Sequence, residues 1–232
     1  MKSIAIITAR GGSKRIPRKN IRLFCGKPII EYSIEAALQS GVFDEVMVST
    51  DDAEIAEIAR NAGANVPFMR SVDNSGDMAA THEVLLEVLA EYEKRGKIFD
   101  MVCCIYPTAP FLTAEKLREC VAKLDESKAD GVVPVVAYSF PPQRCFVIED
   151  GKVAYKWPEN RLKRSQDLEA FYHDCGQFYM LRIVPFKEEK SMVLKNTVPY
   201  IMNEMEVQDI DNEEDWKLAE TKFQIRRETE GK

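Results

Sequence analysis

Short apolar runs alternate with amphipathic segments over more than half of the chain. Five apolar runs are expected to form strands, at residues 4–8, 46–49, 66–68, 101–105 and 131–136. The run 101–105 is near-continuously apolar, as in strands buried on both faces. Between them, apolar residues recur at helical spacing in segments that begin at Pro28, at Asp51 or Asp52, at Thr81 and at Thr113. This alternation predicts an α/β fold in which a doubly wound sheet carries helices on both faces.

The pattern changes at residues 138–173. Apolar residues at 145–148 and 153–155 flank the dipeptide Asp150-Gly151, which is a strong hairpin signal. No amphipathic helix follows to cover this hairpin, and an isolated hairpin is only marginally stable in water. We therefore expect its apolar face to pack against the chain's own core or against a second copy of the chain.

After the hairpin the chain returns to the earlier pattern. We expect strands at 176–181 and 197–202 and a closing helix that contains Trp216, Ala219 and Phe223. A chain of 232 residues with 45% hydrophobic content can bury one sizeable core. No repeat, low-complexity tract or linker is visible, so residues 1–232 are predicted to form a single domain with the hairpin inside it.

The charge is unevenly distributed. The formal net charge is −6, but residues 1–30 carry eight Lys and Arg and no acid, so the remaining 202 residues carry a net −14. An acidic remainder argues against broad contact with nucleic acid or an anionic membrane. It favours local capture of a small anion near the N-terminus.

The cysteines and the apolar runs indicate the compartment. The six cysteines include no C-x-x-C pair and the histidines do not cluster, so zinc is not expected. Cys103 and Cys104 lie in an apolar run, where thiols usually act as small buried hydrophobes in a reducing compartment. No run reaches the ~18 apolar residues of a membrane span, and the first is too short for a signal sequence. We expect a cytoplasmic protein.

The first apolar run leads into a loop rich in cations. Gly11 and Gly12 break the strand, and residues 10–22 contain six Lys and Arg, with no acid before Glu31. Glycine N–H groups, the Ser13 hydroxyl and converging cations suit phosphate oxygens. The loop fits neither the Walker pattern nor the dinucleotide pattern. The alternative is a solvated basic loop or a nucleic-acid patch, which the acidic remainder and the lack of interleaved aromatics disfavour.

The string A-R-G-G-S-K-R-I-P-R-K-N at residues 9–20 resembles the signature of the CMP-sugar synthetases, cytidylyltransferases that activate sialic acid and related nine-carbon acidic sugars. Arg15-Ile-Pro-Arg18 within it is most similar to the pseudaminic acid cytidylyltransferase branch. The resemblance extends over essentially the whole chain. It implies a three-layer, Rossmann-like nucleotidyltransferase fold, a dimerisation arm at 138–173 that completes a homodimer, and transfer of CMP from CTP to the sugar with release of pyrophosphate.

The resemblance also implies nucleotide contacts. Arg10, Ser13 and Lys19 would bind the β- and γ-phosphates, and Asn20 would orient the nucleotide. A second group matches the family's middle motif only in part, and a charged surface loop, or for Thr81 a helix cap, is its alternative. The implied nucleotide-binding residues are Arg10, Gly11, Gly12, Ser13, Lys14, Lys19, Asn20, Arg70, Asp77 and Thr81.

The acceptor sugar is expected beyond the run 101–105, at a strand end where open α/β sheets place ligands. Tyr106 lies there, where the sialate enzymes tend to carry a glutamine. In a strand, neighbouring residues alternate faces, so one of Phe178 and Tyr179 is expected in the core. The sugar-binding residues that the resemblance implies are Tyr106, Gln177, Phe178 and Tyr179.

Asp209-Ile210-Asp211 precedes the last helix. In extended chain, residues i and i+2 project to the same side, so the two carboxylates converge while Ile210 faces the core. This geometry suits Mg²⁺, which takes one or two carboxylates and completes its shell with water and phosphate oxygens. The alternative makes Asp211 a helix N-cap with Glu214 as its partner. With the phosphate loop and the resemblance, we expect a magnesium site and assign catalysis to Arg10, Lys19, Asp209 and Asp211.

The sequence is also compatible with alternative sugars and with one alternative function class. Pseudaminic acid is the expected sugar, and sialic or legionaminic acid is the alternative. A non-catalytic nucleotide sensor of the same fold is the alternative from another class, which the full basic loop and both aspartates disfavour. An NAD-type oxidoreductase would need a glycine fingerprint that the chain lacks.

Overall fold

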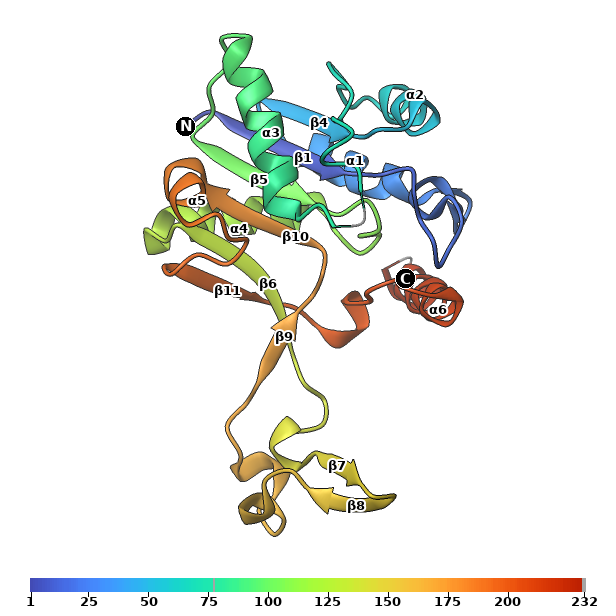
Figure 1. Cartoon of the computed structure of the whole chain (residues 1–232), viewed down its shortest axis with the longest axis vertical. Coiled ribbons are helices and arrows are strands. Elements are labelled where there is room, and N and C mark those ends of the chain that lie inside the picture. The colour runs from blue at the N-terminus through green and yellow to red at the C-terminus, as the bar shows by residue number, and fades with distance from the viewer. Residues whose placement is uncertain (77, 231–232) are drawn as a thin grey trace.

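A mixed, seven-stranded β-sheet forms the centre of the computed structural model, which describes residues 1–76 and 78–230 (Figure 1). Six strands lie in the order β11-β6-β10-β5-β1-β4, and β9 pairs with β6 outside this row. Their bounds are β1 (Ser3–Thr8), β4 (Glu45–Ser49), β5 (Met101–Ile105), β6 (Gly131–Ala137), β9 (Tyr172–Asp174), β10 (Phe178–Arg182) and β11 (Thr197–Ile201). β10 runs antiparallel to both of its neighbours, whereas β1 is parallel to β4 and β5.

Helices cover both faces of the sheet, which confirms the predicted three-layer α/β arrangement. One core cluster joins one face to α1, α2 and α4, and a second joins the other face to α3 and α5. Successive residues of β1 divide between them: Ile4 and Ile6 belong to the second cluster, and Ala5 and Ile7 to the first. The helices are α1 (Ile29–Ser40), α2 (Ala53–Asn61), α3 (Thr81–Lys94), α4 (Ala114–Ser127) and α5 (Ile183–Glu189).

The helix boundaries follow the capping residues in the sequence. Asp52, rather than Asp51, caps α2 by accepting hydrogen bonds from the backbone N–H groups of Glu54 and Ile55. Thr113 caps α4 in the same manner, and Gly41 ends α1 with a φ of 66°. These starts and ends were predicted from the sequence.

A third core cluster lies beside the sheet and is built around α6 (Glu213–Glu230). Trp216 and Ala219 of this helix pack on Phe24 and on Ile16 of the basic loop, and Ile210 is buried in the same cluster. Two short pairing strands, β2 (Leu23–Phe24) and β3 (Lys27–Pro28), and the 3₁₀ turn η1 (Lys19–Ile21) complete this region. The cluster therefore brings the acidic segment near the C-terminus against the basic loop near the N-terminus.

One prediction of secondary structure is wrong. Residues 66–68 form no strand, since Pro67 lacks an N–H for a ladder and only Asn65 bridges to Met47 of β4. The sequence pattern did not indicate strand direction, so the antiparallel course of β10 was not predicted. The short helix α5, with a proline inside it, and the strand β9 were not predicted.

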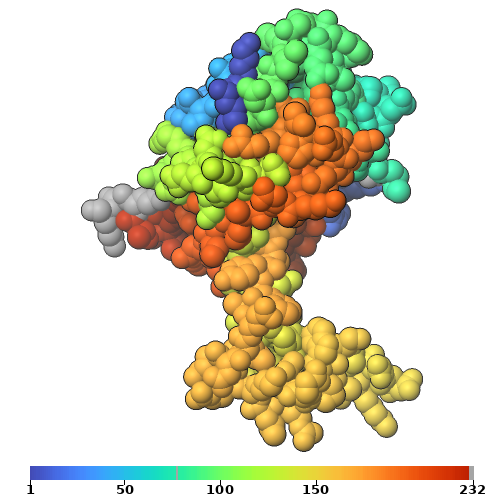
Figure 2. All heavy atoms as spheres, turned by 90° about the vertical axis from the view of Figure 1, so that its left-hand side faces the viewer, coloured from blue at the N-terminus to red at the C-terminus, as the bar shows by residue number. Residues whose placement is uncertain are grey.

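Residues 138–173, which we name the arm, extend away from the sheet on a narrow neck (Figures 1 and 2). The predicted hairpin is present as β7 (Phe146–Glu149) and β8 (Lys152–Tyr155), and Asp150 and Gly151 take φ values of 51° and 74° at its turn. Short 3₁₀ turns fill the rest: η2 (Pro142–Arg144), η3 (Pro158–Asn160) and η4 (Ser165–Asp167). Phe146, Ile148 and Val153 are 56%, 77% and 65% exposed, so the hairpin's apolar face lies open within the described chain.

Candidate functional site

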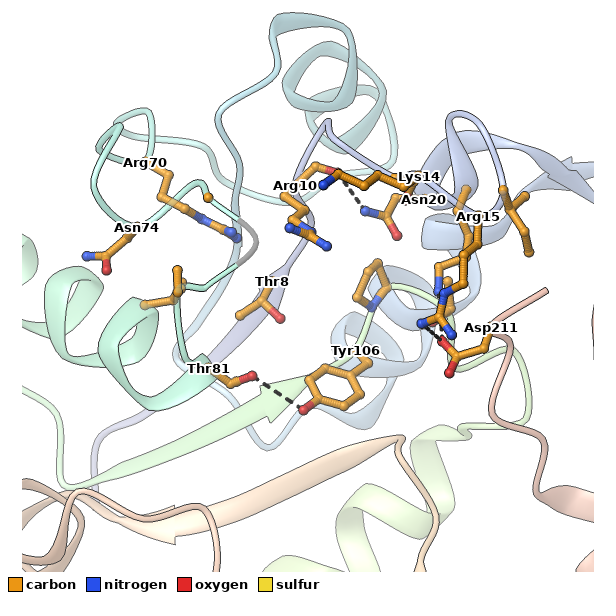
Figure 3. A pocket seen from close by; sticks show the side chains of 18 of the residues that line it. Thr8, Arg10, Lys14, Arg15, Asn20, Arg70, Asn74, Thr81, Tyr106 and Asp211 are labelled. Carbon is orange, nitrogen blue, oxygen red and sulfur yellow. Dashed lines mark hydrogen bonds and ion pairs between the residues drawn. The ribbon is translucent and has the colours of Figure 1, made fainter.

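A cavity of about 560 Å³ lies at the carboxyl ends of β1 and β5 (Figure 3). Ligands are expected at this edge of an open α/β sheet. The predicted site residues that line it are Arg10, Ser13, Lys14, Lys19, Asn20, Arg70, Thr81, Tyr106, Asp209 and Asp211. Gly11, Gly12, Gln177, Phe178 and Tyr179 do not line it, and Asp77 lies outside the described residues. The structure thus gathers residues from both ends of the sequence around one space.

Two contacts fix the start of the basic loop. The buried Asn20 donates from Nδ2 to the carbonyl oxygen of Arg10 at 2.8 Å, and the N–H of Gly11 donates to Oδ1 of Asp51 at 2.9 Å. A Cβ atom at Gly11 would stand 2.7 Å from Oδ2 of Asp52, so only glycine fits there. Gly11 therefore allows the loop to pack closely against the start of α2. Asn20 both lines the cavity and holds the loop through its bond to Arg10.

The cations of the basic loop divide into two groups. Arg10, Lys14, Arg15 and Lys19 line the cavity. By contrast, Arg18 pairs with Asp52 and Glu54, and Arg22 pairs with Glu213. Hydrogen bonding to Arg18 lowers the pKa of Asp52 to about 2. The sequence suggested that no acid neutralises this loop, but the fold brings acids from distant positions to Arg18, to Arg22 and, inside the cavity, to Arg15 and Lys19.

The two aspartates line the cavity beside the basic loop, and Ile210 between them is fully buried, as predicted. The proposed capping role for Asp211 is wrong because Asn212 is the residue that caps α6. Its Oδ1 accepts from the N–H groups of Glu214 and Asp215 at 2.8 and 3.0 Å. Asp215, not Glu214, completes the cap by accepting from the N–H of Asn212. The carboxylate of Asp211 is therefore not used as the helix cap.

Charges around the aspartates are closely coupled. Burial, and then the negative charge of Asp211, raise the pKa of Asp209. Arg15 donates from Nη2 to Oδ1 of Asp211 at 2.6 Å (Figure 3). Nζ of Lys19 lies 3.9 Å from the same oxygen. Lys19 also donates to the carbonyl oxygen of Ile210 at 2.6 Å, and burial lowers its pKa. Lys19 and Arg15 thus link the basic loop to the acidic segment.

The aspartate pair fits a hard divalent cation. Within residues 1–76 and 78–230, no group of three or more His, Cys, Asp and Glu side chains could hold a metal. The carboxylates of Asp209 and Asp211, which line one cavity, are nevertheless a suitable partial set for Mg²⁺, which takes its other ligands from water and substrate phosphates. The donor set therefore matches the predicted metal and leaves positions for a nucleotide.

Arg70 and Thr81 form the third wall. Arg70 is buried, which lowers its pKa, and it donates to the hydroxyl and the carbonyl oxygen of Ser49 at 3.0 and 2.5 Å. Ala80 holds the cap position of α3, so the alternative capping role of Thr81 is wrong. The hydroxyl of Thr81 instead lies 3.4 Å from that of Tyr106 (Figure 3).

Sequence reasoning missed the residues that hold the loop after Arg70. Asn74 lines the cavity, and Glu87 of α3 accepts hydrogen bonds from Asn74 and from the N–H and hydroxyl of Ser71. Neither residue lies in a motif or at an unusual spacing. No local signal in the sequence could have found them.

The three residues predicted from 176–181 for the sugar lie apart from the cavity. Gln177 and Phe178 are 1% and 0% exposed, and Tyr179 is buried with its hydroxyl donating to Asp174. Phe178 and Tyr179 belong to the clusters on opposite faces of the sheet, so both are core rather than one. Fully buried Phe178 offers no surface for a sugar, and this assignment is corrected.

A second cavity, of about 390 Å³, lies on the other side of the aspartates. Asp209 and Asp211 line both cavities, and the second is also lined by His173, Gln208 and Lys222. A cation bound by the two aspartates could therefore be reached from both cavities. Lys222 could not be predicted at this cavity, since a lysine in a charged helix is ordinarily solvent-exposed.

The profile of the cytidylyltransferase family matches residues 4–222. The chain belongs to the cytidylyltransferase family. It is 39% identical over 230 residues to the pseudaminic acid cytidylyltransferase of Campylobacter jejuni subsp. jejuni serotype O:2, with 99% of each chain covered. It is 35% identical over 235 residues to the CMP-N,N'-diacetyllegionaminic acid synthase of Legionella pneumophila subsp. pneumophila, covering 98% of this chain and 99% of that one.

A solved structure has the same fold. CMP:2-keto-3-deoxy-manno-octonic acid synthetase, complexed with CTP, superposes with a TM-score of 0.67 at 18% identity, covering 98% of this cytidylyltransferase and 100% of that chain. At this identity the match bears on architecture only. Among the described helices of the present chain, none is long and apolar enough to cross a membrane.

Proposed function

We propose that this cytidylyltransferase transfers CMP from CTP to pseudaminic acid with release of pyrophosphate. One observation carries the proposal: a wall of cations from the basic loop and a pair of aspartates from the distant acidic segment face the same cavity. Cationic side chains bind phosphate oxygens, and a pair of carboxylates would bind a divalent cation beside them. The relatives named for pseudaminic acid support this choice of sugar over the whole chain length.

The chain's own residues would act mainly by position and charge. Arg10, Lys14 and the Ser13 hydroxyl would hold the β- and γ-phosphates, while Arg70 and Thr81 on the far wall would contact the nucleoside. The anomeric hydroxyl then attacks the α-phosphorus in line, forming the new O–P bond as the bond to the β-phosphate oxygen breaks. The cations beside the leaving pyrophosphate would stabilise its growing charge.

Mg²⁺ is the proposed cofactor, and Asp209 and Asp211 would hold it. When bound, such an ion neutralises phosphate charge and increases the acidity of a hydroxyl. Arg15 and Lys19 now neutralise Asp211, so binding of phosphates at the basic loop would release this carboxylate. Lys19 would keep Ile210, and with it both aspartates, at a fixed distance from the loop.

The sugar choice is tested by competition. The purified protein, CTP and Mg²⁺ are given equal amounts of pseudaminic, legionaminic and N-acetylneuraminic acids, and the products are identified by mass. CMP-pseudaminic acid should predominate, with the legionaminic product as the main by-product, because apolar pockets discriminate between close analogues only weakly. Predominance of the N-acetylneuraminic product would overturn the choice of sugar.

The proposal also covers the oligomeric state and the cellular compartment. The open apolar face of the arm, with Phe146, Ile148 and Val153 exposed, suits contact with a second copy, and we infer a homodimer in the cytoplasm. A non-catalytic sensor of the same fold would bind CTP without releasing pyrophosphate. Pyrophosphate release in the same assay therefore distinguishes enzyme from sensor.

A further inference from the structure

The segment that carries the two aspartates has no regular structure of its own. It leaves β11, makes one 3₁₀ turn, η5 (Glu204–Glu206), and residues 208–211 then run to α6 outside any helix or strand. No ladder or helical hydrogen bonds therefore fix residues 208–211. Their position must come from side chains of neighbouring elements.

Donors from three elements converge on η5. Lys116 of α4 donates from Nζ to Oε1 of Glu206 at 2.8 Å, and Gln177 donates from Nε2 to the carbonyl oxygen of Glu206 at 2.7 Å. Lys222 of α6 donates to the carbonyl oxygens of Glu204 and Val207 at 3.2 and 2.8 Å. Glu206 thus receives bonds on both its side chain and its backbone, three residues before Asp209.

Lys116 is an unusual residue at its position. Its side chain is only 9% exposed, and it lies in the first turn of α4, where the helix dipole disfavours a cation. A buried charge is tolerated when it is paired, and Glu206 supplies the pair. A second bond, to the carbonyl oxygen of Phe111 at 3.0 Å, fixes the ammonium group. The bonds from Lys116 to Glu206 and to the carbonyl oxygen of Phe111 offset the cost of burying its charge at the start of a helix.

Gln177 extends the same network to the aspartates. Its neighbour Gly176 lies against Asp209, since a Cβ there would stand 3.6 Å from Cγ of Asp209. The chain at 176–177 therefore bonds to Glu206 through the Gln177 amide and lies next to Asp209 at Gly176. Because Gln177 is buried, its amide bonds to the backbone of Glu206 instead of contacting a sugar.

We propose that Lys116, Glu206 and Gln177 form a clamp that positions the Asp209–Asp211 segment for metal binding. They are positioning residues, since none of them lines the main cavity. The inference rests on the proposed function, in which the two aspartates hold a divalent cation. Loss of the clamp should weaken the cation site without disturbing the nucleotide site on the basic loop.

The test measures Mn²⁺ binding to the full chain without nucleotide, from the electron paramagnetic resonance signal of free Mn²⁺, for wild type, K116M and E206Q. Groups that orient metal ligands typically change affinity by about 10-fold or more, so K116M should weaken Mn²⁺ by that factor and E206Q by less. The Mn²⁺ concentration for half-maximal turnover should rise in parallel, while the dissociation constant of metal-free CTP stays within about twofold.

Lys97→Met is the matched control. Lys97 pairs with the buried Glu45 at the same distance of 2.8 Å, but near the start of β4, away from the cavity. K97M should lower the melting temperature and leave Mn²⁺ affinity unchanged. Wild-type Mn²⁺ affinity in both folded K116M and folded E206Q, or equal losses in K97M, would overturn the clamp.

One further variant separates the clamp from the function it rests on. Asp209→Asn should abolish most Mn²⁺ binding. If it keeps wild-type affinity, the metal site itself is overturned and the clamp with it. If Asp209→Asn loses Mn²⁺ while K116M and E206Q do not, the metal site stands and the clamp alone is overturned.

Discussion

At the scale of single residues, Asp211 has two competing partners. It is held by Arg15 in the structure, yet in the proposed reaction it holds the cation. Both side chains are well exposed, at 66% and 40%, and such pairs contribute about 0.2–1 kcal/mol. The pair is therefore weak enough to be exchanged when phosphates draw Arg15 into the cavity.

Arg15→Gln should tighten Mn²⁺ binding in the absence of CTP by about 1.4- to 5-fold, which is the free energy of the exposed ion pair expressed as a change in affinity. Titration calorimetry measures it. The control is Arg22→Gln, whose partner is Glu213 rather than an aspartate of the site, and it should have no effect. Weaker Mn²⁺ binding in Arg15→Gln would contradict the competition.

A second prediction concerns the pH dependence of stability at Asp52. Its pKa is about 2 in the folded protein against an ordinary 3.8, so its contribution is present above about pH 4 and disappears as the pH falls towards 2. Asp52→Asn keeps the helix cap but loses the charge for Arg18. It should lower the free energy of unfolding by about 1 kcal/mol at pH 7.

Urea denaturation at pH 7 and pH 3 checks this prediction. The difference between wild type and Asp52→Asn should be clearly smaller at pH 3. Glu54→Gln, at a more exposed partner of Arg18, should change stability by less than about 0.5 kcal/mol at either pH. A difference for Asp52→Asn that is equal at both pH values would contradict the charge pairing.

Individual residues were predictable where their chemistry is local. The cap by Asp52 and the convergence of Asp209 and Asp211 follow from short-range geometry, whereas the packing of Gly11 against Asp52 depends on the fold. The pairing of Arg22 was not predictable, because its acid lies 191 positions away. Fold-dependent contacts of this kind decide which cations face the cavity.

At the scale of elements, the packing of α6 fixes the C-terminal end of the segment that contains the two aspartates. Asn212 caps it with two hydrogen bonds, and its buried face closes the cluster around Trp216. Asn212→Ala should cost about 1 kcal/mol of stability, with Asn212→Asp close to wild type because aspartate is an equally good cap. Thermal melting of the three proteins tests this. A melting temperature for Asn212→Ala equal to wild type would contradict the assignment of the cap.

The elements themselves were largely predictable, and their directions were not. The apolar periods of α3 and β5 and the Asp150-Gly151 turn specify local structure strongly. The reversal of β10 and the absence of a strand at 66–68 depend on tertiary pairing and on Pro67. The sugar residues expected on β10 were misplaced because the strand is buried on both faces.

At the scale of the whole molecule, the arm predicts the assembly. Phe146, Ile148, Val153 and Tyr155 share one face of the hairpin, since Ile148 lies opposite Val153 and Phe146 opposite Tyr155. The double variant Ile148→Asp, Val153→Asp should convert a dimer into a monomer in analytical ultracentrifugation at micromolar concentration. Lys152→Asp, on the other face, should leave the mass unchanged. A monomeric wild type would contradict the homodimer.

The central claim is that the aspartates beside the basic loop make this cavity a site of CMP transfer. Asp209→Asn tests it most directly, because the change is isosteric and Asp209 contributes no apolar surface to the core clusters. The measurement is CMP-sugar formation from CTP and pseudaminic acid with Mg²⁺, together with calorimetric CTP binding without metal. Turnover should fall at least about 100-fold while metal-free CTP binding stays within about threefold. A folded Asp209→Asn protein that retains wild-type turnover would contradict the account.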